Sequence, residues 1–124
     1  MFLLVLMGCS GGPAPCTDAV ADACTPLYNP TFDEAYVRTF EPTCGTGGAS
    51  CHGPDGAQGG LVLADPNEAY DHLSDYVVAE DASCSELIVR LAEHGESWSM
   101  PLGGELSDAE VCAIATWIDD GALR

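Results

Sequence analysis

The chain has 124 residues and a formal net charge of −17 at pH 7, from 20 acidic residues, three arginines and no lysine. This length indicates one domain, and the charge excludes nucleic acids and anionic membranes as partners, because both are bound through dense Lys/Arg patches. A hydrophobic fraction of 47% excludes a disordered acidic tail. The core of so short a chain is small, however, and such domains often need a disulfide, metal or cofactor for stability.

The N-terminus carries the pattern of an export signal. Residues 1–8 are almost entirely apolar and end at Cys9, a run far shorter than the roughly 20 residues needed to span a bilayer. It is typical of the hydrophobic part of a signal peptide. Its end, Leu6-Met7-Gly8-Cys9, resembles the lipobox of bacterial lipoproteins, which implies that Cys9 is lipidated and becomes the first residue of the mature chain. Ser10 in place of Asp implies, by the same resemblance, an outer-membrane location. The alternative is a random apolar N-terminus with an ordinary buried cysteine.

Residues 9–30 are rich in Gly and Pro and show little periodicity, which favours a flexible tether between the lipid and the folded domain. Removal of residues 1–8 leaves six cysteines besides Cys9, and an even set in an oxidising compartment predicts disulfides, although their connectivity cannot be read from sequence. We expect one bridge to close a small loop inside the tether and a second to pin two helices. The cysteines concerned are Cys16 and Cys24 for the first bridge, and Cys84 and Cys112 for the second.

Four later segments each open with a cap residue followed three positions later by Glu, the spacing of a capping box at a helix start. The caps are Thr31, Asp65, Ser83 and Ser107. Apolar residues recur behind each cap at helical spacing, and Gly95 and Gly121 are placed as C-terminal stops. The prediction is therefore an all-α domain of about four helices over residues 31–124, with two long Gly-rich connections at 41–64 and 95–106, of the kind that usually carries function.

These two connections contain the side chains that could bind a cofactor. The first contains Cys44 and the run Cys51-His52-Gly53, and the second contains Met100-Pro101. An adjacent thiol and imidazole can bind one cofactor together, and a thioether some fifty residues later can bind its opposite face. Met/His ligation of a haem iron raises its potential and suits electron transfer.

The order of these motifs resembles a class I c-type cytochrome. An N-terminal helix leads into Cys-His-Gly, a Gly-rich loop follows, then a Met-Pro loop, and finally a helix that runs from Leu106-Ser107 through Trp117-Ile118 to Gly121-Ala122. The resemblance covers residues 31–124 and is strongest to the small cytochrome-like domains of bacterial lipoproteins and planctomycete-type multidomain proteins. It implies a cytochrome c-like fold around a haem pocket, with Leu61 and Leu63 packed on the haem face.

The same resemblance implies the site and the function. Haem c would be the cofactor, with Cys51 as its covalent anchor and His52 and Met100 as the iron ligands. The protein would be a monohaem electron carrier with no catalytic residues, since a six-coordinate iron has no position for a substrate. We expect a monomer on the periplasmic or outer side of the outer membrane, with a redox partner that presents a basic docking surface.

The attachment motif departs from this family, because Gly48 stands where Cys-x-x-Cys-His has its first cysteine. Three arrangements follow: attachment through Cys51 alone, attachment through both Cys44 and Cys51, or a Cys44–Cys51 disulfide without haem. The last corresponds to an alternative function, a haemless, disulfide-stapled binding or assembly lipoprotein. A weaker alternative is a copper site from His52, Met100 and a thiolate, which would need a second histidine nearby.

Overall fold

The computed structural model describes residues 12–45, 52–53 and 60–124. The predictions made for the signal peptide, for lipidation at Cys9, for Gly48 and for Cys51 lie outside these residues. They therefore stay predictions.

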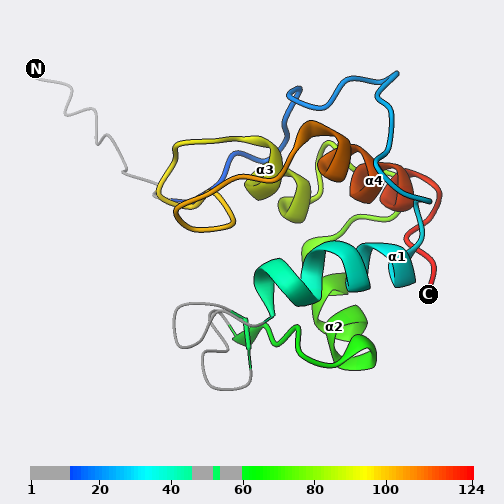
Figure 1. The fold of residues 1–124 in the computed structure, drawn as a ribbon. Helices are drawn as coiled ribbons and strands as arrows, with labels where there is room; N and C mark the ends of the chain where they lie inside the picture. The colour runs from blue at the N-terminus through cyan, green and yellow to red at the C-terminus, as the bar shows by residue number, and fades with distance from the viewer. Residues whose placement is uncertain (1–11, 46–51, 54–59) are drawn as a thin grey trace, which may run out of the picture.

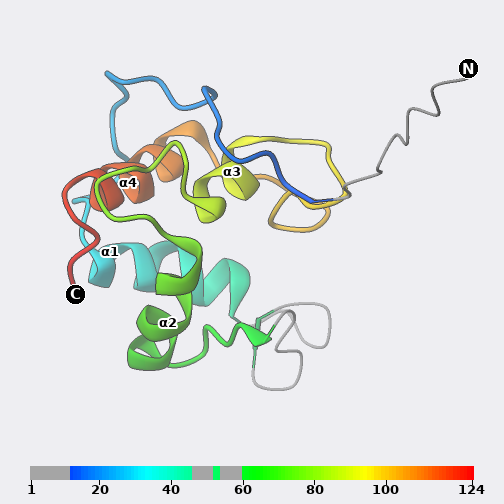
Figure 2. The same ribbon diagram turned by 180° about the vertical axis from the view of Figure 1, so that it is seen from behind.

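The described residues fold into helices joined by irregular segments, which confirms the all-α prediction (Figure 1). Helix α1 (Phe32–Ala35) continues directly into η1 (Tyr36–Cys44), a wider-turned π-helix. Helix α2 (Pro66–Leu73) runs into a short 3₁₀ turn, η4 (Ser74–Tyr76), and is followed by α3 (Glu86–Ala92) and α4 (Asp108–Asp119). In both views α1 and η1 run between the α3–α4 pair and α2 (Figures 1 and 2). Within the described ranges, no helix has the length and hydrophobicity needed to cross a bilayer.

Three of the four predicted helix starts are confirmed by their cap hydrogen bonds. The Thr31 hydroxyl accepts from the Glu34 N–H, and the Asp65 carboxylate accepts from the N–H groups of residues 67 and 68. Ser107 forms the full reciprocal capping box with Glu110. These bonds satisfy N–H groups that have no partner inside the helix, so local sequence alone determines where these helices begin.

The start of α3 was predicted wrongly. Its N-cap is Ser85 and not Ser83, so the helix begins two residues later than the Ser83…Glu86 spacing indicates. Ser85 is fully buried; its hydroxyl accepts from the Val78 N–H, and its single proton faces the Asp81 carbonyl at 2.8 Å and the Val78 carbonyl at 3.2 Å. Tertiary contacts therefore fix the helix start. At the other end α3 stops at Ala92, so Gly95 lies beyond its cap, whereas Gly121 directly follows the C-cap of α4 as predicted.

The core confirms the predicted helical faces. The aromatic rings of Phe32, Tyr36 and Phe40 are buried along one side of α1 and η1. The Phe32 ring lies 5.6 Å from the Trp117 ring of α4, centroid to centroid, and 5.1 Å from that of Tyr70 in α2. Aromatic pairs at such distances add to the burial of their area. Phe32 thus packs α1 against both α2 and α4.

The described part of the segment predicted to be a flexible tether, residues 12–30, is fastened to the helices. Cys16 is bonded to Cys84 and Cys24 to Cys112, so the expected pairing of Cys16 with Cys24 and of Cys84 with Cys112 is wrong, although all four cysteines form disulfides. The segment runs over α3 and α4 in both views (Figures 1 and 2). Backbone hydrogen bonds from Thr17 to Ser83 and from Leu27 to Ala109 follow the same path, which explains why each cysteine meets a distant partner and not its neighbour in sequence.

Tyr28 closes this segment onto the core. It is buried, and its hydroxyl lies 2.9 Å from the Thr39 hydroxyl, which in turn donates to the Glu110 carboxylate. Burial raises the pKa of the Tyr28 phenol. Residues 12–30 are therefore part of the folded domain.

Candidate functional site

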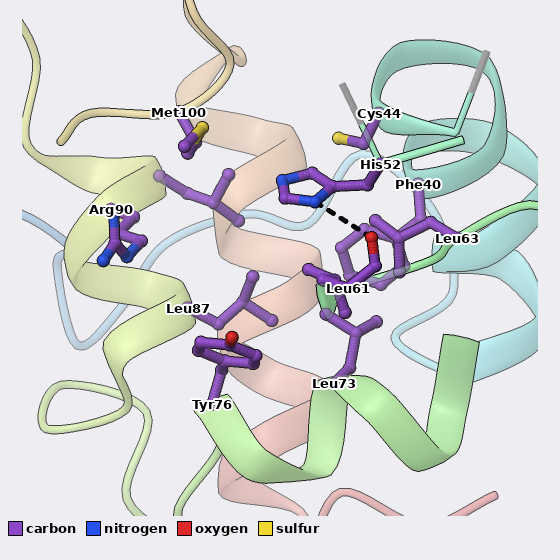
Figure 3. Close-up of a pocket in the computed structure, with 11 residues that line it drawn as sticks. Phe40, Cys44, His52, Leu61, Leu63, Leu73, Tyr76, Leu87, Arg90 and Met100 are labelled. Carbon is purple, nitrogen blue, oxygen red and sulfur yellow. Dashed lines mark hydrogen bonds between the residues drawn. The ribbon is translucent and has the colours of Figure 1, made fainter. Parts of the chain in front are cut away.

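A cavity of about 300 Å³ opens between η1, the stretch around residues 61–63, α2 with η4, and α3 with the loop that follows it (Figure 3). Its size falls at the lower end of the range for small-molecule and cofactor sites. Most of the side chains on its wall are apolar. They are Phe40, Cys44, His52, Leu61, Leu63, Leu73, Tyr76, Leu87, Arg90, Leu91 and Met100.

Three chain segments meet beside this cavity through backbone contacts. The His52 N–H donates to the Cys44 carbonyl at 3.0 Å, and the Leu63 N–H donates to the His52 carbonyl at 2.6 Å. The segments are so close that a Cβ added to Gly45 would lie 2.7 Å from the Leu63 carbonyl oxygen, and one added to Gly53 would lie 2.9 Å from the Gly45 carbonyl oxygen. Glycine is required at both positions for this approach, and the contact fixes the backbone that carries His52.

The imidazole of His52 is oriented by a contact with a backbone carbonyl. Its Nδ1 lies 3.2 Å from the Leu61 carbonyl oxygen, and the ring points into the cavity (Figure 3). Because a carbonyl oxygen only accepts hydrogen bonds, Nδ1 must carry the proton. In the neutral ring Nε2 then holds a free lone pair, as in most metal-binding histidines, whose other nitrogen donates to a carbonyl or carboxylate.

Met100 reaches the cavity from another wall, on the loop after α3 (Figure 3). Its N–H donates to the Arg90 carbonyl at 2.9 Å. The preceding turn is closed by Ser99, whose hydroxyl donates to the Glu93 carbonyl at 2.6 Å and accepts from the Glu96 N–H at 3.0 Å. The backbone around Met100 is therefore held to α3, and its thioether is presented to the same cavity as His52.

This donor set fits a haem better than a bare metal ion. Haem iron takes four ligands from the porphyrin and needs only two from the protein, and the cavity offers one imidazole and one thioether. The described part of the chain contains no cluster of three or more His, Cys, Asp or Glu side chains that could hold a metal ion by themselves.

A copper site lacks its second histidine here. Nδ1 of His72 accepts from the Val62 N–H, Nδ1 of His94 lies 3.1 Å from the Glu105 carboxylate, and neither ring lines the cavity. His94 lies beyond the end of α3, whose last residue is Ala92.

Of the residues predicted for the site, Cys44, His52, Met100, Leu61 and Leu63 line one cavity, while Cys51 lies outside the described residues. Sequence reasoning missed Arg90. The available signal was helical spacing, because Arg90 lies three residues after Leu87 and one before Leu91, on the face of α3 that lines the cavity.

Comparison with known proteins matches part of the chain to a described family. Residues 49–101 match the model of the family described as Planctomycete cytochrome C. The matched range includes both His52 and Met100. Searches of curated proteins and of solved structures gave no significant match. The helical architecture and the family match together support a cytochrome c-like domain with an all-α, cytochrome c-like fold.

Proposed function

We propose that this protein is a monohaem c-type cytochrome that transfers electrons, with His52 and Met100 as its axial iron ligands. The observation that carries the proposal is that an imidazole with its Nδ1 bonded to a backbone carbonyl and a methionine thioether line the same largely apolar cavity.

The chain's own residues prepare both ligands. The Leu61 carbonyl holds the proton of His52 on Nδ1, which makes the lone pair of Nε2 a stronger ligand for a metal. The hydrogen bond from the Met100 N–H to the Arg90 carbonyl fixes the backbone that presents the thioether. Leu61, Leu63 and Leu73 give the cavity apolar walls. When bound, haem c supplies a one-electron iron couple. With His52 and Met100 both bound to the iron, no coordination position would remain for a substrate, so we propose no enzymatic activity.

We assign the covalent anchor to Cys51, the residue before His52. Cys44 lies on the cavity wall and is the candidate for a second thioether. We further propose that the domain is attached to the outer membrane through a lipid on Cys9 and faces the periplasm or the cell exterior. Its partner would be a redox protein with a basic docking surface.

The test is expression of the full chain with its export signal in a bacterial host that carries the c-type haem maturation machinery. We expect a protein with the visible spectrum of a low-spin c-type cytochrome and an intact mass raised by one haem. Cys51→Ala should abolish covalent haem, and Cys44→Ala is the matched control: retention of haem in that variant shows attachment by one thioether.

A colourless protein with both disulfides intact, obtained under full maturation conditions, would contradict the proposal. It would support the alternative of a haemless, disulfide-stapled lipoprotein that binds or assembles other components.

A further inference from the structure

Among the described residues that line the cavity, Arg90 alone has a positively charged side chain. The chain contains just three arginines and no lysine. The other two arginines lie elsewhere. Arg38 is exposed on η1 and pairs with Glu34, and Arg124 pairs with Asp33 at the C-terminus. In a chain with 20 acidic residues, a guanidinium beside an apolar cavity needs a specific reason.

The guanidinium of Arg90 has hydrogen-bonding capacity to spare. Its Nη1 donates to the Trp98 carbonyl at 3.1 Å, whereas its Nη2 lies 3.6 Å from the Glu86 carboxylate, too far for a direct hydrogen bond. A guanidinium has five N–H donors in a fixed fork. With a side chain that is 27% exposed, Arg90 is placed at the margin of the cavity, where a ligand would meet water.

We propose that Arg90 is the binding position for a carboxylate of the cavity's ligand. Under the function proposed above, on which this inference rests, that carboxylate is a propionate of the haem. Arg and carboxylate form short, charge-assisted and often bidentate hydrogen bonds. A carboxylate placed elsewhere around this strongly acidic chain would meet repulsion, so Arg90 determines which edge of the ligand turns toward α3.

Arg90 also connects this position to the loop that carries Met100. Its carbonyl accepts from the Met100 N–H and its side chain donates to the Trp98 carbonyl. The same residue thus holds the anionic edge of the ligand and the backbone of the distal ligand. We regard it as a positioning residue, because it acts on the iron through the propionate and through Met100.

The test is a spectroscopic titration of the full chain, prepared without haem maturation, with haem and with haem dimethyl ester, which lacks both carboxylates. Arg90→Gln should weaken the binding of haem by roughly ten- to a hundredfold, the effect of losing one charged hydrogen-bonded pair. It should leave the binding of the dimethyl ester unchanged. Arg38→Gln is the matched control, since Arg38 also pairs with the Glu four residues earlier but lies outside the cavity. This variant should bind both compounds like the wild type.

Equal weakening of both compounds by Arg90→Gln would overturn the proposal, because it would mean that Arg90 supports the fold and not a carboxylate. Unchanged haem binding would overturn it as well, while leaving the proposed function standing. Failure of the wild-type chain to bind either compound would overturn the proposed function and this inference together. Arg90→Lys keeps the positive charge but lacks the bidentate donor geometry of a guanidinium. It should lose less haem affinity than Arg90→Gln if charge pairing is the cause, whereas misfolding would not depend on the charge that is kept.

Discussion

The imidazole of His52 owes its orientation to a backbone carbonyl nine residues away. Leu61 was expected to pack against a cofactor face, and its side chain does line the cavity. Its carbonyl oxygen has a second role, because it fixes the protonated nitrogen of His52. Substitution of the Leu61 side chain does not remove this carbonyl, so the two roles are separable.

Met100→Ala should leave haem attached while opening the distal position. The sulfur-to-iron charge-transfer band at the red end of the visible spectrum should disappear, and the reduction potential should fall because the thioether favours ferrous iron. Added cyanide should also bind faster. The measurements are visible spectroscopy, potentiometric titration and ligand-binding kinetics of the matured protein.

Leu102→Ala is the control for that variant, because Leu102 lies two residues away in the same loop and is 59% exposed. It should leave the spectrum and the potential unchanged. A Met100→Ala protein with the wild-type spectrum would mean that a residue other than Met100 is the distal ligand.

A site residue can be predicted from sequence when a short local motif marks it. His52 and Met100 could be singled out because each lies in a short motif, and the cavity contains both. Arg90 could not be singled out with the same ease. A charged residue in a helix is usually on a solvated face, and only the position of α3 against the loop 95–106 places it on the cavity wall.

At the scale of elements, the sequence predicts helix starts well where the cap is local. Thr31, Asp65 and Ser107 bond to N–H groups two or three residues away, so their spacing carries the information. Ser83 and Ser85 both precede α3, and only Ser83 has a Glu three residues later, so the pattern favours Ser83. Ser85 becomes the cap because it is buried against Val78, a contact that local spacing does not contain.

The disulfides show the same limit more strongly. The separations in sequence are 68 residues for Cys16–Cys84 and 88 for Cys24–Cys112, and no local pattern reports such contacts. Cys84 lies two residues before the start of α3, which carries Leu87, Arg90 and Leu91 of the cavity wall. The N-terminal segment is thus bonded to the chain just before the helix that forms one side of the candidate site.

Tryptic digestion tests this pairing, because trypsin can cut inside the chain only after Arg38 and Arg90. After free thiols are alkylated and the protein is denatured without reductant, the observed bridges should hold all three fragments together as one species. The fragment that ends at Arg38 contains Cys16 and Cys24, and each of these is bonded to a different one of the other fragments. Mass spectrometry before and after reduction gives the answer. Release of the fragment ending at Arg38 without reductant would contradict the observed bridges, because both of them join that fragment to another.

At the scale of the whole molecule, negative charge dominates. The three arginines each have a carboxylate partner, Glu34, Glu86 or Asp33. With a net charge of −17, the protein lacks the basic surface by which a lysine-rich cytochrome docks on an acidic oxidase. Recognition by charge would therefore require a partner that is basic around its own electron-entry site.

Electron transfer should then depend steeply on salt, and in opposite directions for the two kinds of partner. Attraction between opposite charges speeds association and is screened over about 10 Å at 0.1 M salt. Stopped-flow rates of the matured protein with a basic small redox protein should fall as salt rises, whereas rates with an acidic one should start low and increase. A competing explanation is that the acidity serves only solubility and spacing at a crowded surface. Flat salt dependence with both partners would establish that explanation, since repulsion and attraction alike would then be absent from the encounter.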